Sequence, residues 1–399
     1  MLGGKSVVRL FCMFSAVAAL ALLGFMPGAR LAAQSTGAVY VLSNQPAENA
    51  VIVFHRNADG TLQPMPSGSF PTGGAGLGSG PNPLASQGAL ILSADNRLLF
   101  AANAGSDSIT AFAISGDSLT ALETVPSGGT QPVSLTMNKD MVYVLNSGGA
   151  SPNSTGFRIT PAGHGTKLLV PIPGSTQVLP NGSAAAAAEI SFTPDGSSLF
   201  VTEPAVNQIV SFTVSSGGHT ALAGTFSASS AVSSPSAGAG PFGLVFSKDL
   251  VITANTASGT PQAGSMSSYS MSSTGALAPA SSAVMNNQTA STWALLAEKG
   301  SLALTTNTVS GTISSYAVAP KTGSLTLSNP VASSILASDG SSLFPSDMAL
   351  SSDGGFLYVR NGANGTVSAF AIQANGSLTP LTQTQVNGLP DTAAGIAAR

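Results

Sequence analysis

Three carboxylates carry most of the chemistry that this 399-residue sequence offers. Glu189 and Asp347 stand at matching positions, each at the start of an apolar segment, where other copies of the same repeat have Ala, Ser or Gly. Glu203 ends the segment after Glu189, where six other copies have Asn. Neighbouring carboxylates can share a proton, activate water or bind a cation. We predict all three as catalytic residues, with Glu189 and Glu203 forming a pair; the alternative is a set of solvated rim carboxylates.

Three further residues are candidates for ligand binding. Trp293 begins another apolar segment and either stacks on a ligand or packs in the core. Arg360 is one of the few cations near the predicted site, and Asp391 opens the last apolar segment. The sequence has no D-x-D-x-D loop and no H-E-x-x-H motif. We therefore predict no metal ligands and no cofactor, with a divalent cation on the carboxylates as the alternative.

The elements that must position these residues come from a repeat. One position recurs at intervals of 43 to 59 residues, which is the length of a propeller blade. It is occupied by Asn44, Asn103, Asn146, Glu203, Asn255, Asn307 and Asn361. Each copy ends an apolar strand there and continues into an alternating strand with one aromatic residue. Asp-Gly or Asp-Asn pairs before the strand and Gly-x-Leu after the aromatic predict hairpins. The recurrent Asn is predicted to bond its own loop backbone.

The ends of the repeat predict a closed ring. The repeat begins on a second strand (38–43) with no first strand before it, and residues 391–398 resemble an orphan first strand. Pairing these two segments removes an exposed sheet edge. We predict an all-β, seven-bladed β-propeller of four-stranded antiparallel blades, closed by the C-terminal strand on the N-terminal blade.

This topology sorts the polar residues by face. The first strands of all blades start at one face, the mouth, where Glu189, Asp347 and Asp391 would gather. A Gly-, Pro- and Ser-rich loop over 64–87 lies on the same face and either shapes a pocket or covers the channel. His55, His164 and His219 fall in or near hairpins of the opposite face, so we predict exposed imidazoles that take no part in catalysis.

The N-terminus and the composition bound the localisation and the partners. Lys5 and Arg9, an apolar run and small residues up to Ala33 predict a signal peptide over 1–33, followed by one domain over 34–399. A membrane anchor is the alternative. Cleavage would remove three of the 13 basic residues and none of the 16 acidic ones, leaving a net charge of −6. The sequence has no cationic run, which argues against nucleic-acid partners. We predict an exported monomer, periplasmic or extracellular, with no membrane span after cleavage.

The repeat resembles the lactonase family of seven-bladed propellers, which includes 6-phosphogluconolactonase-type enzymes and relatives with YVTN repeats. The resemblance covers residues 38–399 and is carried by segments such as Asp-Gly-Gly-Phe-Leu-Tyr-Val-Arg-Asn at 353–361. It implies hydrolysis of a lactone at the channel mouth. The family's Pro-Arg-His segment is absent, because the matching segments at 131–134, 240–243 and 345–348 contain neither Arg nor His. The alternative is a non-catalytic propeller that binds a surface protein or a glycan.

Overall fold

The structure is a computed structural model of the chain. It describes residues 1, 36–78, 80–160, 168–215, 217–218, 220–227, 238–272 and 276–399. The predicted signal peptide, apart from Met1, and two of the three histidines, His164 and His219, lie outside the described residues. Among the described residues, no helix is long and apolar enough to cross a membrane.

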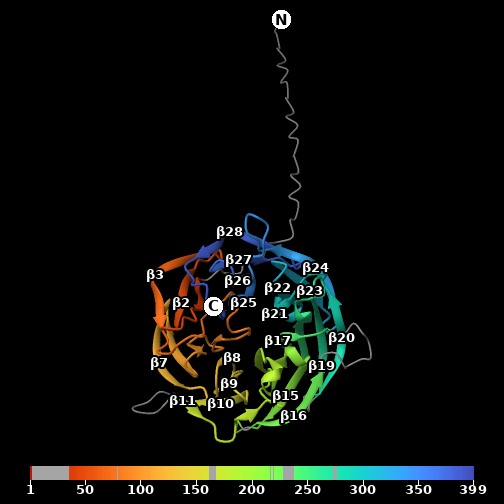
Figure 1. The fold of residues 1–399 in the computed structure, drawn as a ribbon. Helices are drawn as coiled ribbons and strands as arrows, with labels where there is room; N and C mark the ends of the chain where they lie inside the picture. Colours follow the sequence, from red (N-terminus) through yellow and green to blue (C-terminus); the bar gives the residue numbers. More distant parts are fainter. Residues whose placement is uncertain are drawn as a thin grey trace. The chain divides into compact units, whose positions relative to one another are not determined.

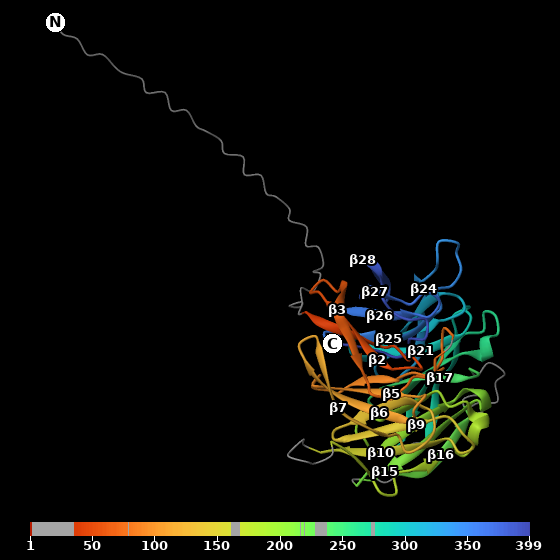
Figure 2. The ribbon, with the colours of Figure 1, turned by 60° about the vertical axis from the view of Figure 1, so that its left-hand side comes forward.

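Seven antiparallel sheets are arranged like blades around a common central axis (Figures 1 and 2). In spatial order from the centre outwards, the first blade is β29 (Ile396–Ala398), β1 (Gly37–Leu42), β2 (Ala50–Arg56) and β3 (Leu62–Pro71). The second is β4 (Leu90–Leu92), β5 (Leu98–Asn103), β6 (Ser108–Ser115) and β7 (Ser118–Pro126). The third is β8 (Pro132–Asn138), β9 (Met141–Asn146), β10 (Asn153–Ile159) and β11 (Leu169–Pro171), with β12 (Gln177–Val178) also on β10. The fourth is β13 (Glu189–Phe192), β14 (Ser198–Glu203), β15 (Gln208–Val214) and β16 (Thr220–Ser227).

The remaining three blades repeat the same order. The fifth is β17 (Pro241–Ser247), β18 (Leu250–Asn255), β19 (Ser265–Met271) and β20 (Leu277–Met285). The sixth is β21 (Ser291–Ala297), β22 (Leu302–Asn307), β23 (Thr312–Val318) and β24 (Leu325–Ser334). The seventh is β25 (Pro345–Leu350), β26 (Phe356–Asn361), β27 (Thr366–Ile372) and β28 (Leu378–Asn387). Four 3-10 turns lie between strands: η1 (Gly182–Ala185), η2 (Pro204–Val206), η3 (Ala257–Gly259) and η4 (Glu298–Gly300).

Ring closure by the C-terminal strand is confirmed. β29 pairs antiparallel with β1, placing Val39 opposite Ala398 and Val41 opposite Ile396. The strand is shorter than the predicted 391–398, although backbone hydrogen bonds between Leu42 and residues 394 and 395 extend the pairing. The pairing turns β1 from an edge strand into an internal one, which removes an aggregation-prone edge.

The aromatic residue predicted in each blade lies on the third strand from the centre and packs between blades. All seven rings are buried: Phe54, Phe112, Phe157, Phe212, Tyr269, Tyr316 and Phe370. The second strands β9, β22 and β26 are buried along their whole length, as their continuous apolar sequences predict. The core is therefore a ring of sheet-to-sheet contacts around the channel.

The recurrent Asn residues have a fold-forming role, but their partners differ from the prediction. The Asn307 side chain donates hydrogen bonds to the hydroxyls of Thr312 and Ser314 on the next strand. Asn361 does the same with Thr366 and Ser368. In these blades the amide bonds side chains of the neighbouring strand, because alternate residues of that strand face the same way. Asn44 and Asn146 donate to the backbone carbonyls of Thr392 and Ser127.

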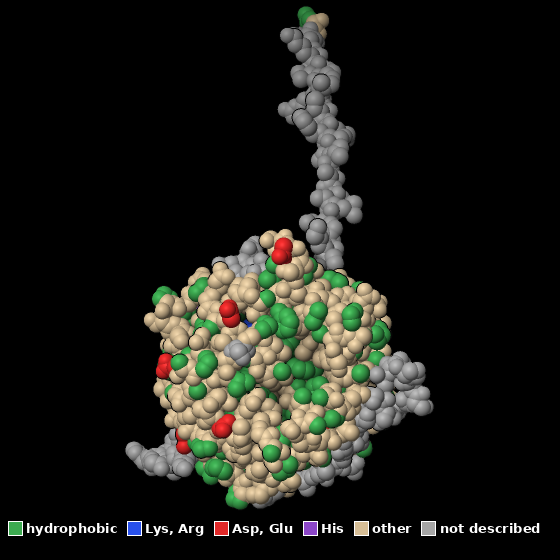
Figure 3. Space-filling model, viewed as in Figure 1, with side chains coloured by type: hydrophobic (Ala, Val, Ile, Leu, Met, Phe, Trp, Pro, Cys, Tyr) green, Lys and Arg blue, Asp and Glu red, His purple; other side chains and the backbone are tan. Residues whose placement is uncertain are grey.

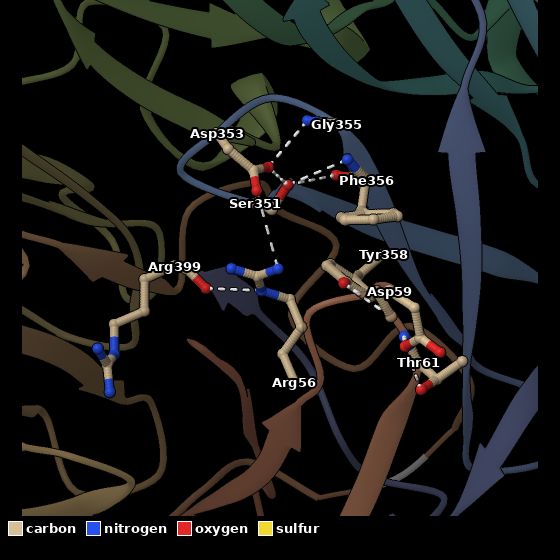
Figure 4. A network of polar contacts seen from close by, with 10 residues as sticks. Arg56, Asp59, Thr61, Ser351, Asp353, Gly355, Phe356, Tyr358 and Arg399 are labelled. Carbon is tan, nitrogen blue, oxygen red and sulfur yellow. Dashed lines mark hydrogen bonds and ion pairs between the residues drawn. The ribbon is translucent and has the colours of Figure 1, made fainter. Parts of the chain in front are cut away.

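Charged residues join the closing blade to its neighbours (Figure 4). Arg56 on β2 is fully buried and donates from Nε to the backbone carbonyl of Arg399 at 3.0 Å. Its Nη1 lies 3.9 Å from a carboxylate oxygen of Asp353 in the seventh blade, and its guanidinium stacks over the Phe356 ring. On the other side of the blade, His55 contacts Asp117 of the second blade at 2.6 Å. We call these two groups of contacts the closing seam.

Candidate functional site

The central channel contains a cavity of about 460 Å³ that the inner strands of all seven blades line. Most of its lining is apolar, with Leu135, Leu244 and Leu296 as examples. Glu189 and Asp347 are the only ionisable residues among its lining residues, and each is nearly fully buried. The structure therefore brings two of the three predicted catalytic carboxylates to one cavity.

Glu189 is the first residue of β13 and links two blades. Its Oε2 accepts a hydrogen bond of 2.6 Å from the backbone N–H of Leu244 on β17. Burial raises the pKa of the Glu189 carboxyl well above its ordinary value. The hydrogen bond from Leu244 opposes this rise, and the charge of Asp347 adds to it.

Asp347 lies at a bulge of β25, between residues that pair regularly with β26. Its backbone is left-handed, with φ of 58°, which is uncommon for a residue other than Gly. One carboxylate oxygen accepts from the N–H of Met348 and the other from that of Ile396 on the closing strand. Burial raises the pKa of Asp347 to about 7, although these hydrogen bonds and the charge of Arg360 lower it. A bulge re-aims a side chain, and here it directs the carboxylate into the channel.

These contacts follow a rule of the inner strands, whose channel-facing N–H groups have no further strand to pair with. In several blades, a group of the preceding blade bonds such an N–H. Gly88 bonds Leu135 through its carbonyl, and Ser134 bonds Ile190 through its hydroxyl. In the same way, Glu189 of the fourth blade bonds an inner-strand N–H of the fifth blade, and Asp347 of the seventh blade bonds one of the first blade. Bonding these edge groups keeps buried backbone donors satisfied.

Glu203 is not brought to this cavity, and the predicted pair with Glu189 is not formed. Glu189 pairs in register with Thr202, so the side chain of Glu203 points to the opposite face of the sheet. There it accepts a hydrogen bond of 2.5 Å from the amide of Asn181, which also bonds Gln208. Burial raises the pKa of Glu203, and the bond from Asn181 opposes the rise. The prediction overlooked that neighbouring residues of a strand face opposite ways.

Trp293 and Arg360, predicted to touch a ligand, instead hold the chain segment over 72–89, which joins β3 to β4. The Trp293 ring is buried edge-on against Phe242, and its Nε1 donates to the carbonyl of Ser86 at 3.0 Å. Both terminal nitrogens of Arg360 donate to the carbonyl of Pro81, and Nη1 also donates to the hydroxyl of Ser346. Burial lowers the pKa of Arg360 to about 10. Both side chains are buried, and neither is among the lining residues of the channel cavity.

The 72–89 segment covers the channel at the mouth. The predicted loop over 64–87 is shorter than expected, because residues up to Pro71 belong to β3. The last part of the segment forms hydrogen bonds to two further blades. The hydroxyl of Ser86 donates to the carbonyl of Val133 in the third blade, and the N–H of Gln87 donates to the carbonyl of Ala188 next to the fourth blade. Both alternatives of the prediction are found, because the segment covers the channel and its residues Asn82 and Ala85 also line a hollow.

Gln87 is the functional candidate that the sequence analysis missed. Its side-chain amide lines the cavity and bonds the backbone of Ala294 on β21. The signal in the sequence was Gly243. It stands in the fifth blade at the position that Glu189 holds in the fourth, and it has no side chain that could bond the inner strand of the next blade. Asp391, in contrast, is exposed and is not among the lining residues of the cavity. His55 also lies outside the lining, at the closing seam.

A second, smaller hollow of about 340 Å³ lies beside the 72–89 segment. It is lined by Asn82, Phe242, Thr292, Val309 and Phe344, among others, and has no ionisable lining residue. Figure 3 shows hydrophobic side chains gathered around the central depression of one face, with carboxylates only as scattered spots. Among the described residues, no group of three His, Cys, Asp or Glu side chains could hold a metal ion.

The fold and the cavity define a seven-bladed propeller whose channel holds two buried carboxylates. A family model described as "Lactonase, 7-bladed beta-propeller" matches residues 30–170 and 263–392, more than half of the sequence. The chain therefore belongs to the lactonase family of seven-bladed β-propellers. The matched ranges include Asp347 and leave out Glu189. A search of curated proteins found no match.

Solved structures support the fold. A protein of Lactobacillus plantarum is 19% identical with a TM-score of 0.64, covering 90% of this chain and 98% of its own. A candidate 6-phosphogluconolactonase of Bacteroides fragilis is 18% identical with a TM-score of 0.63, covering 90% and 97%. A periplasmic gluconolactonase of Pseudomonas aeruginosa is 15% identical with a TM-score of 0.63, covering 91% and 98%. At these identities the likeness establishes the fold alone.

Proposed function

We propose that this protein is an exported lactonase that opens the ring of an uncharged lactone in the channel cavity, with Glu189 and Asp347 as its acid–base pair. One observation carries the proposal: both carboxylates line the same cavity, and neither forms an ion pair among the described residues. Family membership supports the reaction class.

The proposed reaction needs only water and the two carboxyl groups. Asp347 in its ionised form takes a proton from a water molecule, whose oxygen bonds to the carbonyl carbon of the lactone. The bond between that carbon and the ring oxygen then breaks, and protonated Glu189 gives its proton to the departing ring oxygen. The product is the open hydroxy acid. The proton on Asp347 returns through solvent to Glu189, so the enzyme is restored.

The environments of the two groups suit these roles near neutral pH. A pKa of about 7 lets Asp347 act as a base there. Burial, with the charge of ionised Asp347 added, keeps the proton on Glu189 at a higher pH than is ordinary for a carboxyl. We expect a bell-shaped dependence of kcat/KM on pH, rising as Asp347 ionises and falling as Glu189 loses its proton.

The cavity favours an uncharged substrate. Its lining contains no Lys or Arg, and the terminal nitrogens of the nearby Arg360 are bonded to Pro81 and Ser346. A phosphorylated sugar lactone would require such cations. The cavity volume of about 460 Å³ falls within the range of small-molecule sites. We propose that the protein acts in the periplasm or outside the cell as a monomer.

A panel of uncharged lactones, assayed by acid release, tests this proposal. We expect Glu189→Gln and Asp347→Asn each to lower kcat/KM by about 10²- to 10⁴-fold, the usual contribution of a general acid or base. Glu48→Gln, at an exposed acid, serves as the matched control and should keep full activity. Hydrolysis that survives both substitutions unchanged would remove these residues from the mechanism.

A second candidate function is supported by one specific observation. The carboxylate oxygens of Glu189 and Asp347 already bond backbone N–H groups of neighbouring inner strands. Such capping alone would explain their presence in a non-catalytic propeller that binds a surface protein or glycan at its mouth. Absence of hydrolysis over the whole panel, together with lower stability of the two variants, would favour this function.

A further inference from the structure

The Gln87 side chain occupies the channel in the manner of a bound amide. Its Oε1 accepts a hydrogen bond of 3.0 Å from the N–H of Ala294, and its Nε2 donates to the carbonyl of the same residue at 3.0 Å. The same Nε2 lies 3.5 Å from Oε1 of Glu189. One carboxamide therefore joins the backbone of the sixth blade to the candidate acid of the fourth.

The absence of a side chain at Gly243 makes room for this contact. By analogy with Glu189 and Ser134, a side chain of the fifth blade would bond the inner strand of the sixth. A Cβ atom at Gly243 would lie 2.5 Å from both Ala294 N and Gln87 Oε1, closer than such atoms approach. The fifth blade thus offers no side chain to the N–H of Ala294. Gln87, which is far away in the sequence, accepts that hydrogen bond instead.

A lactone has the same shape as this carboxamide at its reacting end. Both are planar, with a carbonyl oxygen and a second heteroatom on one carbon. With the carbonyl oxygen at the N–H of Ala294, the ring oxygen would lie near the place of Nε2, beside Oε1 of Glu189. That is where the proposed mechanism needs a proton donor to the leaving oxygen, and a backbone N–H is a suitable donor to the carbonyl. A lactone would thus reproduce the contact with the N–H of Ala294 but not the donation to its carbonyl, which only a cyclic amide can make.

We propose that the Gln87 carboxamide is a built-in competitor that occupies the binding site of the lactone carbonyl, and that the substrate displaces it from Ala294. This inference rests on the proposed function for the identity of the substrate. Its ligand class is a small, uncharged cyclic ester or amide.

Displacement requires only rotation of the Gln87 side chain. Its backbone is fixed on both sides, since the N–H bonds the carbonyl of Ala188 and the carbonyl accepts from the hydroxyl of Ser134. The rest of the segment stays held by Trp293 and Arg360. Gln87 would therefore set the apparent affinity of the site without forming part of the chemistry.

Calorimetric binding of δ-valerolactam, which resembles a six-membered lactone but resists hydrolysis, tests the inference. When a site is open only for a fraction of the time, the apparent Kd equals the intrinsic Kd divided by that fraction. We expect Gln87→Ala to lower the Kd of the lactam by about tenfold or more relative to the unmodified protein. Gln373→Ala, at an exposed glutamine, is the matched control and should leave the Kd unchanged. An unchanged Kd in folded Gln87→Ala would overturn the inference.

Two further variants keep the test decisive. If Gln87→Ala does not fold, Gln87→Met retains the length of the side chain without its carboxamide and should also bind more tightly. Adding Gly243→Ala to Gln87→Ala places a methyl group against the N–H of Ala294, so the gain in affinity should disappear. Tighter lactam binding without lactone hydrolysis would uphold this inference while the proposed function fails. Hydrolysis with no effect of Gln87 on the Kd would do the reverse.

Discussion

The channel cavity and the closing seam both contain carboxylates, buried in the cavity and partly exposed at the seam, and their pKa values shift in opposite directions. At the seam, Asp353 receives hydrogen bonds from Ser351 and Gly355 and lies beside buried Arg56 (Figure 4). Burial opposes its ionisation, yet these contacts outweigh burial and its pKa lies below the ordinary value. In the cavity, burial outweighs the backbone hydrogen bonds, and the pKa values of Glu189 and Asp347 rise.

This difference separates a structural use of charge from the carboxyl protonation that the proposed reaction requires. A buried charge with a partner of opposite sign stays ionised and joins elements together. A carboxyl whose burial outweighs its hydrogen bonds keeps its proton to a higher pH than is ordinary, which is a property of general acids and bases. The two long-range pairs of the seam attach the first blade to both of its neighbours, where the chain ends must be joined.

The largest expected effect breaks the seam. Arg56→Leu removes the cation beside Asp353 and leaves the carbonyl of Arg399 without its hydrogen bond, so we expect the free energy of unfolding to fall by about 2 kcal/mol. Arg97→Leu is the matched control, since its pair with Asp95 is largely exposed and should contribute little. Denaturant titration measures both. Equal stability of the two variants would show that the seam does not depend on its charge.

A smaller effect sharpens the contrast through pH. Glu189 and Asp347 hold protons in the folded protein at pH values where the unfolded chain has released them. The free energy of unfolding should therefore fall as pH rises from the ordinary carboxyl range towards 7, by at most about 1.4 kcal/mol per pH unit for each group. Asp347→Asn should flatten this slope, and Asp391→Asn, at an exposed residue, should not. A slope that Asp347→Asn leaves unchanged would contradict the raised pKa.

The smallest effect concerns the outer side of the seam. His55 and Asp117 are each about a quarter to a third exposed, so water screens their interaction. We expect His55→Gln to change the free energy of unfolding by less than about 1 kcal/mol. A loss as large as that of Arg56→Leu, measured in the same titration, would show that both sides of the first blade contribute equally.

Local pattern was enough to predict the fold. The spacing of the recurrent Asn, the aromatic in each outer strand and the Asp-Gly turns are properties of single blades, and the unpaired strand at each end implied closure. These features depend on residues within about one repeat of each other, where strand alternation and turn chemistry act directly. The placement of Glu189 and Asp347 at the mouth followed from the order of strands within a blade, since both residues start a first strand. Glu203 was misplaced because its alternation with Thr202 was not applied.

The tertiary structure alone decided what each site residue contacts. Trp293 and Arg360 bond a segment that is more than 200 residues away in the sequence. Gln87 bonds the backbone of Ala294 because Gly243, in another blade, has no side chain to do so. Nothing in the local sequence encodes these pairings, because they depend on which edges meet when seven sheets close into a ring. Burial, and with it the pKa values of Glu189 and Asp347, is likewise a property of the closed ring. The sequence determined the blades, and their closure determined the chemistry of the channel.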